Sequence, residues 1–150
     1  MKTLPLNAWL LGYAGVIPFL LLFLVISLDT AILTVDEGQA GSWLLAYAAV
    51  ILSFLGAVHW GVALTASNNV PPVRVRRLFT YSVLPSLLAW LALLLPLKLA
   101  FFTMMLLVVL AYFADKFLLF SLIDSQYQKL RLHLTVAVSS LLFVTGLTVS

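Results

Sequence analysis

The chain has 150 residues, of which 64% are hydrophobic and only 9% are charged. Soluble domains carry about a quarter charged residues, so this composition excludes an ordinary soluble domain and favours a protein embedded in a bilayer. The net charge of +3 comes from basic residues in short loops between apolar segments, which argues against a nucleic-acid-binding surface, and the lack of cysteine excludes disulfides and thiol nucleophiles.

The first apolar segment, residues 8–28, is long enough to cross the hydrocarbon core as one helix. It is longer than the apolar core of a secretory signal peptide, which has about 7–15 residues, and no convincing cleavage site follows it. We therefore expect a retained helix. Pro18 removes one backbone hydrogen bond and predicts a kink, which a membrane helix tolerates when a neighbour satisfies the freed carbonyl.

The second predicted span, residues 43–64, lies between two expected loops. Residues 29–42 contain three acidic residues and two glycines, which is typical of a loop. Residues 65–77 contain a Pro-Pro pair and three arginines. Such a segment is not expected to continue an apolar helix, because proline interrupts the helix and arginine is costly in hydrocarbon.

The apolar segment from residue 78 to residue 122 is about twice the length of one crossing. Pro96 and Lys98 interrupt it near the middle, which predicts two spans, 78–95 and 99–122, joined by a tight turn. A polar patch follows and separates these spans from a last one at residues 132–149. The sequence thus predicts an all-α fold: a single domain, residues 1–150, built as an integral membrane bundle of five transmembrane helices.

The basic residues predict that the N-terminus lies inside and the C-terminus outside. Lysine and arginine in short loops stay on the cytoplasmic or matrix side of a membrane. With the N-terminus inside, only Lys98 falls outside, and the outer loop holds Asp29, Asp36 and Glu37. The basic residues that then lie inside are Lys2, Arg74, Arg76, Arg77, Lys116, Lys129 and Arg131.

A stripe of small side chains runs along the second span at every fourth residue, formed by Ala49, Ser53, Ala57 and Gly61. Such a stripe lets another helix approach closely, and close packing is what associates helices in lipid. His59 points to nearly the opposite side of the same helix, at about 100° per residue. We therefore expect a central helix whose His59 faces a second helix or a cavity instead of lipid.

A polar cluster is predicted in the inner half of the bundle. His59 and Asp115 lie at similar depths from the inner ends of their helices, at about 1.5 Å per residue. An ionised carboxylate at that depth needs a partner. The candidate partners are His59, Tyr81, Arg131 and Lys116, although we expect the Lys116 side chain to reach toward the inner headgroups.

Two interpretations of this cluster remain open. In the first, His59 and Asp115 hold helices together through hydrogen bonds. In the second, the polar pair and nearby aromatic residues bind a quinone, a lipid or another amphipathic ligand. The candidate ligand-binding residues are His59, Trp60, Tyr81, Tyr112, Asp115 and Arg131. The aromatic residues among them are equally typical of a membrane-interface belt.

Other chemistries have weaker support in the sequence. A haem held by His59 and His133 rests only on the two histidines of the chain, without further spacing evidence. No motif positions a nucleophile, so no catalytic residue is assigned, and no acidic cluster predicts a metal site. The cofactor stays unassigned. We interpret the arginines at positions 74, 76, 77 and 131 first as orientation and headgroup-anchoring residues.

Five blocks in order along the chain resemble a family of small multi-pass proteins, domain-of-unknown-function family 3429, which includes transmembrane protein 69-like proteins. The blocks are residues 11–19, 51–61, 81–90, an aspartate in the fourth span and residues 127–135; the second, ILSFLGAVHWG, is the best marker. The resemblance implies an all-helical protein of the bacterial or mitochondrial inner membrane, and no particular chemistry. Family members usually have tryptophan where this chain has Gln126.

From these features we expect a non-enzymatic packing, stabilising or assembly component of a membrane complex, with the lipid bilayer and membrane proteins as partners. The alternative is a ligand binder or a redox-linked enzyme that uses the pocket at His59 and Asp115. A cavity on the order of a few hundred Å³ at those residues would favour the alternative. A closed, hydrogen-bonded set of side chains would favour the first expectation.

Overall fold

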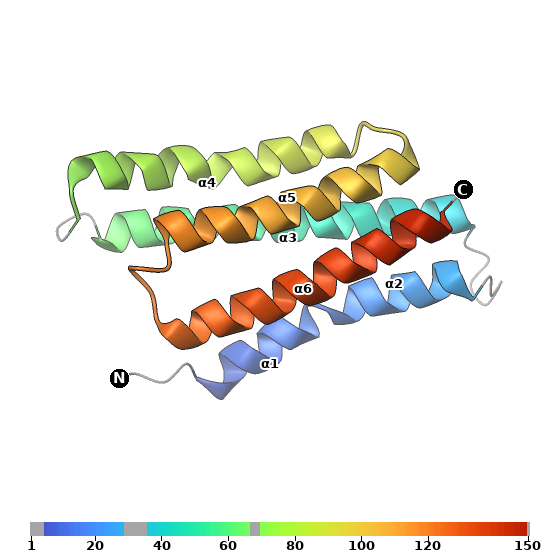
Figure 1. Cartoon of the computed structure of the whole chain (residues 1–150), viewed down its shortest axis with the longest axis horizontal. Helices are drawn as coiled ribbons and strands as arrows, with labels where there is room; N and C mark the ends of the chain where they lie inside the picture. The colour runs from blue at the N-terminus through green and yellow to red at the C-terminus, as the bar shows by residue number, and fades with distance from the viewer. Residues whose placement is uncertain (1–4, 29–35, 67–69, 150) are drawn as a thin grey trace.

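The computed structural model describes residues 5–28, 36–66 and 70–149, and every regular element in these ranges is an α-helix. The elements in chain order are α1 (Leu6–Ala14), α2 (Ile17–Ser27), α3 (Glu37–Ala66), α4 (Pro72–Ala92), α5 (Leu97–Leu118) and α6 (Ser125–Thr148). The helices form one elongated bundle, and the end of the bundle where α1 begins is opposite the end where α6 finishes (Figure 1).

Four helical segments in these ranges are long and apolar enough to cross a membrane. They are Leu6–Ser27, which combines α1 and α2, Glu37–Thr65 within α3, and the whole of α5 and α6. Helix α4 has 21 residues, so it is about 32 Å long. It carries three arginines in its first two turns, which lower its apolar character at one end.

The kink expected at Pro18 is a two-residue interruption between α1 and α2. Helix α1 ends at Ala14, and α2 restarts at Ile17 with Pro18 in its first turn, where no backbone donor is needed. The carbonyl oxygen of Gly15 at the break accepts a hydrogen bond of 3.0 Å from the hydroxyl of Tyr47 on α3. A neighbouring helix therefore satisfies a backbone group that the interruption exposes.

Three helices begin six or seven residues earlier than the sequence predicted. Helix α3 starts at Glu37 because Asp36 caps it, accepting a 2.7 Å hydrogen bond from the backbone nitrogen of Gln39. Helix α6 starts at Ser125 because Asp124 caps it, accepting a 2.7 Å hydrogen bond from the backbone nitrogen of Gln126. The predicted boundaries were wrong, since polar residues near these ends form the first helical turns instead of loops.

The start of α4 was also misplaced by the sequence prediction. Residues 72–77 were expected in a loop, but Pro72 occupies the first position of the helix, where proline fits without cost. Part of each expected connecting segment, residues 29–35 and 67–69, lies outside the described residues. The tight turn expected after residue 95 is present, since α4 ends at Ala92 and α5 begins at Leu97 after Pro96.

Helix α3 is central, since it packs against α2, α4 and α5, while α6 packs against α5, α2 and α1. The closest approach is between α3 and α4. A Cβ atom added at Gly56 would lie closer than 3.0 Å to the backbone carbonyl oxygen of Ser82. Glycine at position 56 therefore permits the two backbones to touch.

The predicted packing stripe of α3 is not where another helix of this chain lies. Ser53, Ala57 and Gly61 are exposed, and Ala49 is half-buried. A Cβ atom added at Gly61 would meet no described atom within 4 Å. The prediction chose this face because its residues are small. The contact within the chain instead uses a different face, where a single glycine opposes the backbone of α4.

The buried side chains form two apolar clusters. The larger occupies most of the bundle and includes Leu52 of α3, Ala111 of α5 and Val138 of α6. The smaller has Ala63, Leu78 and Leu119 at its centre. Along each of α3, α5 and α6, one buried ionisable residue falls between the two clusters, and these residues form the polar layer described next.

Candidate functional site

The polar layer consists of His59 on α3, Asp115 on α5 and Arg131 on α6. Their exposed fractions are 0%, 1% and 3%, so none of the three faces lipid or water. Ionisable groups at this depth are costly unless they are paired. The early start of α6 matters here, because it places Arg131 well inside a helix instead of in a connecting loop.

Arg131 and Asp115 form a direct ion pair. The Nε atom of Arg131 donates to Oδ2 of Asp115 at 2.6 Å. The guanidinium also donates from Nη1 to the hydroxyl of Thr135 at 2.6 Å, and that hydroxyl donates to the carbonyl oxygen of Arg131 at 2.8 Å. A guanidinium and a carboxyl group therefore pair directly between α5 and α6 inside the bundle.

His59 lies on the other side of the same carboxylate. Its Nε2 atom is 3.3 Å from Oδ1 of Asp115, and its Nδ1 atom is 3.2 Å from the carbonyl oxygen of Leu55. A carbonyl oxygen only accepts, so Nδ1 carries the hydrogen. Nε2 of His59 and Oδ1 of Asp115 are then both acceptors and cannot form a hydrogen bond with each other. A hydrogen bond between them requires one additional proton, on either atom.

Tyr81 of α4 covers the imidazole. The centroid of its ring lies 4.6 Å from that of His59, with the two planes tilted by 60°. The structure thus brings together four of the candidate residues, His59, Tyr81, Asp115 and Arg131, from four different helices. They form a closed contact set that holds α3, α4, α5 and α6 at one level of the bundle.

Two other candidates lie outside this set. Trp60 is 49% exposed, and its ring packs edge-on against Phe79 at 5.1 Å. Tyr112 is half-buried and packs against Phe113 and Phe120. Consecutive residues of a helix point about 100° apart, so Trp60 diverges from His59. The aromatic slot that the sequence suggested beside the polar pair is therefore not formed by these two residues.

The two histidines face different surroundings. His133 is exposed on α6, and its Nδ1 atom is 2.9 Å from the hydroxyl of Tyr13 on α1. Trp9 also lies near it, with ring centroids 6.5 Å apart. His59 instead faces Asp115 in the interior. The arrangement does not bring the two imidazoles to a common site, so it gives no support to a haem held between them.

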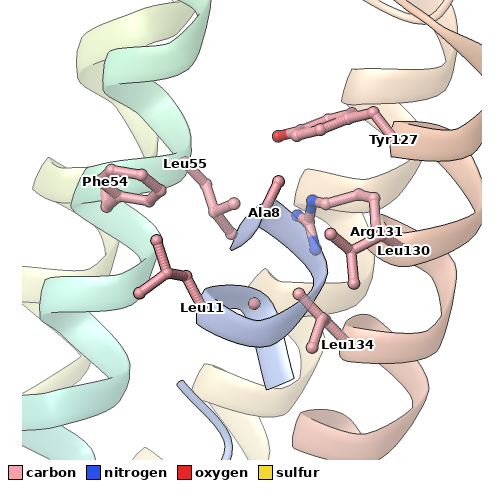
Figure 2. Close-up of a pocket in the computed structure, with 9 residues that line it drawn as sticks. Ala8, Leu11, Phe54, Leu55, Tyr127, Leu130, Arg131 and Leu134 are labelled. Carbon is pink, nitrogen blue, oxygen red and sulfur yellow. The ribbon is translucent and has the colours of Figure 1, made fainter. Parts of the chain in front are cut away.

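Arg131 also reaches a cavity on the face of α6 that is turned toward α1 and α3 (Figure 2). The cavity has a volume of about 320 Å³ and lies between α1, α3 and α6. Its polar lining residues are Arg131 and Tyr127; the others are Ala8, Leu11, Gly12, Phe54, Leu55, Leu130 and Leu134. Neither His59 nor Asp115 lines it, so it is not the cavity that the ligand-binding alternative would place at those residues.

Tyr127 and Thr135 are the residues that sequence reasoning missed. They lie four positions before and four positions after Arg131, so in a helix all three share one face. The sequence prediction began the last span at residue 132, so Tyr127 and Arg131 fell outside the predicted helix. Asp124 in front of the polar segment is the feature that indicates the earlier start.

The arginines at the start of α4 differ in their contacts. Nη2 of Arg74 donates to the carbonyl oxygen of Leu118 at 3.2 Å and to the hydroxyl of Ser121. Arg74 therefore donates a hydrogen bond to a backbone carbonyl at the C-terminal end of α5, where carbonyls lack helical partners. Arg76 and Arg77 are exposed.

Comparison with known proteins gives one family and one curated relative. A family model described as "Protein of unknown function (DUF3429)" matches residues 4–147. Transmembrane protein 69 of Xenopus tropicalis is 38% identical over 94 residues, which are 63% of this chain and 35% of that protein. No solved structure matches the chain. The apolar helices and this relative identify an integral membrane protein with several crossings.

Proposed function

The chain belongs to the DUF3429 family, and from that premise we propose that it is a five-pass inner-membrane protein acting as a packing, stabilising or assembly component of a membrane complex. Four apolar helical segments support most of the crossings. Helix α4 supplies the remaining one, since its length of about 32 Å suits the hydrocarbon core and it packs against both α3 and α5.

An odd number of crossings requires the chain to start and finish on opposite sides of the membrane. The start of α1 and the end of α6 lie at opposite ends of the bundle (Figure 1), which supports this topology. Helices α4 and α6 begin, and α5 ends, at the end of the bundle where α1 begins (Figure 1). The helix turns at that end carry most of the basic residues, namely Arg74, Arg76, Arg77, Lys116 and Lys129. By the positive-inside rule, that end faces the cytoplasm or matrix.

Single-cysteine labelling tests this topology, because the natural chain has no cysteine. In intact cells, we expect a membrane-impermeant maleimide to label Gln39→Cys at the start of α3. We expect Arg76→Cys, at the start of α4, to react only after the membrane is permeabilised. Both positions are exposed in the bundle, so burial does not limit the reaction. Labelling of the two positions from the same side would contradict the five-pass arrangement.

The observation that carries the assembly role is the open stripe of small residues on α3. Ser53, Ala57 and Gly61 remain exposed, while the rest of the bundle surface is dominated by large apolar side chains. Small residues permit a helix of another protein to approach closely, and this packing drives association inside a bilayer. The stripe therefore suits a partner transmembrane helix.

The polar layer supports a structural role for the ionisable residues. Asp115 contacts both Arg131 and His59, and all three side chains are at most 3% exposed. These groups contact one another and hold α3, α5 and α6 together. The layer then acts as a clamp that keeps the stripe on α3 in a fixed position.

Photo-crosslinking tests the assembly role. Ala57→Cys carrying a benzophenone maleimide is expected to form a protein adduct of defined mass in native membranes. The matched control is Leu87→Cys on α4, which is 51% exposed and lies outside the stripe, and it should form only lipid adducts. Adding Gly61→Leu should abolish the adduct at position 57. Identical adduct patterns at positions 57 and 87 would contradict the proposal.

A further inference from the structure

The guanidinium of Arg131 has one nitrogen that the polar layer does not use. Its Nε and Nη1 atoms are bonded to Asp115 and Thr135, but Nη2 is buried and has no hydrogen-bond partner among the described residues. Leaving a buried donor unpaired costs free energy, and the cost is larger for a charged group. An acceptor placed against Nη2 would remove this cost.

Nη2 belongs to a side chain that lines the cavity between α1, α3 and α6. Figure 2 shows the guanidinium of Arg131 and the hydroxyl of Tyr127 reaching from α6 into the same space. The two residues are four positions apart, so they lie one above the other on the same helix face. The cavity therefore has two hydrogen-bond donors at one end and apolar walls elsewhere.

A second cavity continues this space along the bundle. It has a volume of about 140 Å³ and shares Leu11, Gly12, Phe54, Leu55 and Leu134 with the first. Its further lining residues, which include Phe19, Ile51 and Val138, lie deeper along α2, α3 and α6. The two cavities form one groove, which we call the α1 groove, with a polar end at Arg131 and a single apolar extension.

The α1 groove opens sideways toward the bilayer. Leu11 and Phe54, which line both cavities, are 74% and 66% exposed. A molecule dissolved in the membrane can therefore enter between α1 and α3 without crossing water. This opening distinguishes the groove from the contact between His59 and Asp115, neither of which lines it.

The charge at the polar end favours an uncharged acceptor. The positive charge of Arg131 is already balanced by Asp115, at 2.6 Å from Nε, and Arg131 is the one cation in the described lining of the groove. An anionic headgroup would place a second negative charge near that carboxylate without a further counter-ion. A carbonyl oxygen accepts from Nη2 without this penalty.

We propose that the α1 groove binds a lipid-soluble quinone. One ring carbonyl accepts hydrogen bonds from Nη2 of Arg131 and from the Tyr127 hydroxyl, and the single apolar tail follows the extension toward Phe19 and Val138. The groove has one extension, which suits a molecule with one tail better than a two-tailed phospholipid. This inference is independent of the stripe on α3 and of any partner protein.

The test is a binding titration of the full chain, purified and delipidated in detergent, with decylubiquinone as the probe. Quenching of Trp9 reports binding when Trp43, Trp60 and Trp90 are replaced by phenylalanine, because Trp9 lies on α1 beside the groove residue Ala8. We expect saturable quenching with a stoichiometry near one quinone per chain.

Three variants define the site. Arg131→Lys keeps a cation beside Asp115 but removes Nη2, and Gly12→Leu places a side chain in the groove. We expect each variant to raise the dissociation constant for decylubiquinone about tenfold or more. Tyr127→Phe removes only a hydroxyl, should fold normally, and is expected to weaken binding about threefold to tenfold. The matched control is Ala14→Leu, on the same helix but outside the groove lining, which should bind like the natural chain.

Two results would overturn the proposal. One is unchanged affinity in both Tyr127→Phe and Gly12→Leu, provided that both variants keep the unfolding temperature of the natural chain. The other is a phospholipid that co-purifies in a one-to-one ratio, is lost in Gly12→Leu and is not displaced by decylubiquinone. That second result would assign the groove to a structural lipid.

Discussion

Asp115→Ala is expected to lower the free energy of unfolding by about 3–5 kcal/mol, because it leaves the guanidinium of Arg131 buried without a counter-ion. Arg131 is 3% exposed and its Nε atom is held by the lost carboxylate. No other carboxylate is among its described partners. The measurement is unfolding of the purified chain in detergent, followed by loss of helical circular dichroism.

A double variant separates the ion pair from simple loss of packing. Asp115→Leu combined with Arg131→Met removes both charges and keeps apolar volume, so it should recover most of the stability lost in Asp115→Ala. Lys116→Ala, at the neighbouring exposed position, should change stability by less than about 0.5 kcal/mol. If Asp115→Ala and Lys116→Ala have equal effects, the polar layer does not clamp the bundle.

Gly56→Val is the second substitution with a large expected effect. The new Cβ atom would overlap the carbonyl oxygen of Ser82, which belongs to the backbone of α4 and cannot move aside as a flexible side chain can. We expect α3 and α4 to separate and the free energy of unfolding to fall by about 1–3 kcal/mol or more. The same detergent unfolding experiment measures this change.

Gly61→Val provides the matched control on the same helix. A Cβ atom at position 61 would meet no described atom within 4 Å, so the purified chain should keep its stability to within about 0.5 kcal/mol. The comparison isolates the contact with α4 from the general effect of a β-branched residue in a helix. Equal destabilisation at positions 56 and 61 would show that the close approach to Ser82 is not the cause.

The two glycines also show that a stripe of small residues does not identify which face of a helix packs within its own chain. Both Gly56 and Gly61 lie on α3, and the sequence pattern favoured the face with four small residues at regular spacing. The structure buries Gly56 against α4 and leaves Gly61 open. Spacing shows which residues share a face, but the rotation of a helix about its axis depends on all its neighbours.

The polar segment that begins α6, which the sequence prediction treated as a loop, determines the geometry of the candidate site. Residues with polar side chains suit a loop or the first turns of a helix equally well, and the Asp124 cap selects the helix. Once α6 begins there, Tyr127, Arg131 and Thr135 fall on one face. The Arg131–Thr135 bond and the α1 groove both follow from that start.

The amino-acid sequence by itself determined that this protein is embedded in a bilayer and that its apolar segments are helices. It also determined that His59 and Asp115 lie at similar depth. These properties follow from composition, segment length and periodicity, which act along one chain segment at a time. Only the tertiary structure decided that Arg131 pairs with Asp115, that Trp60 and Tyr112 point elsewhere and that Arg131 lines a groove. The reason is physical: contacts between distant segments depend on the rotation and register of every packed helix, and no single segment encodes them.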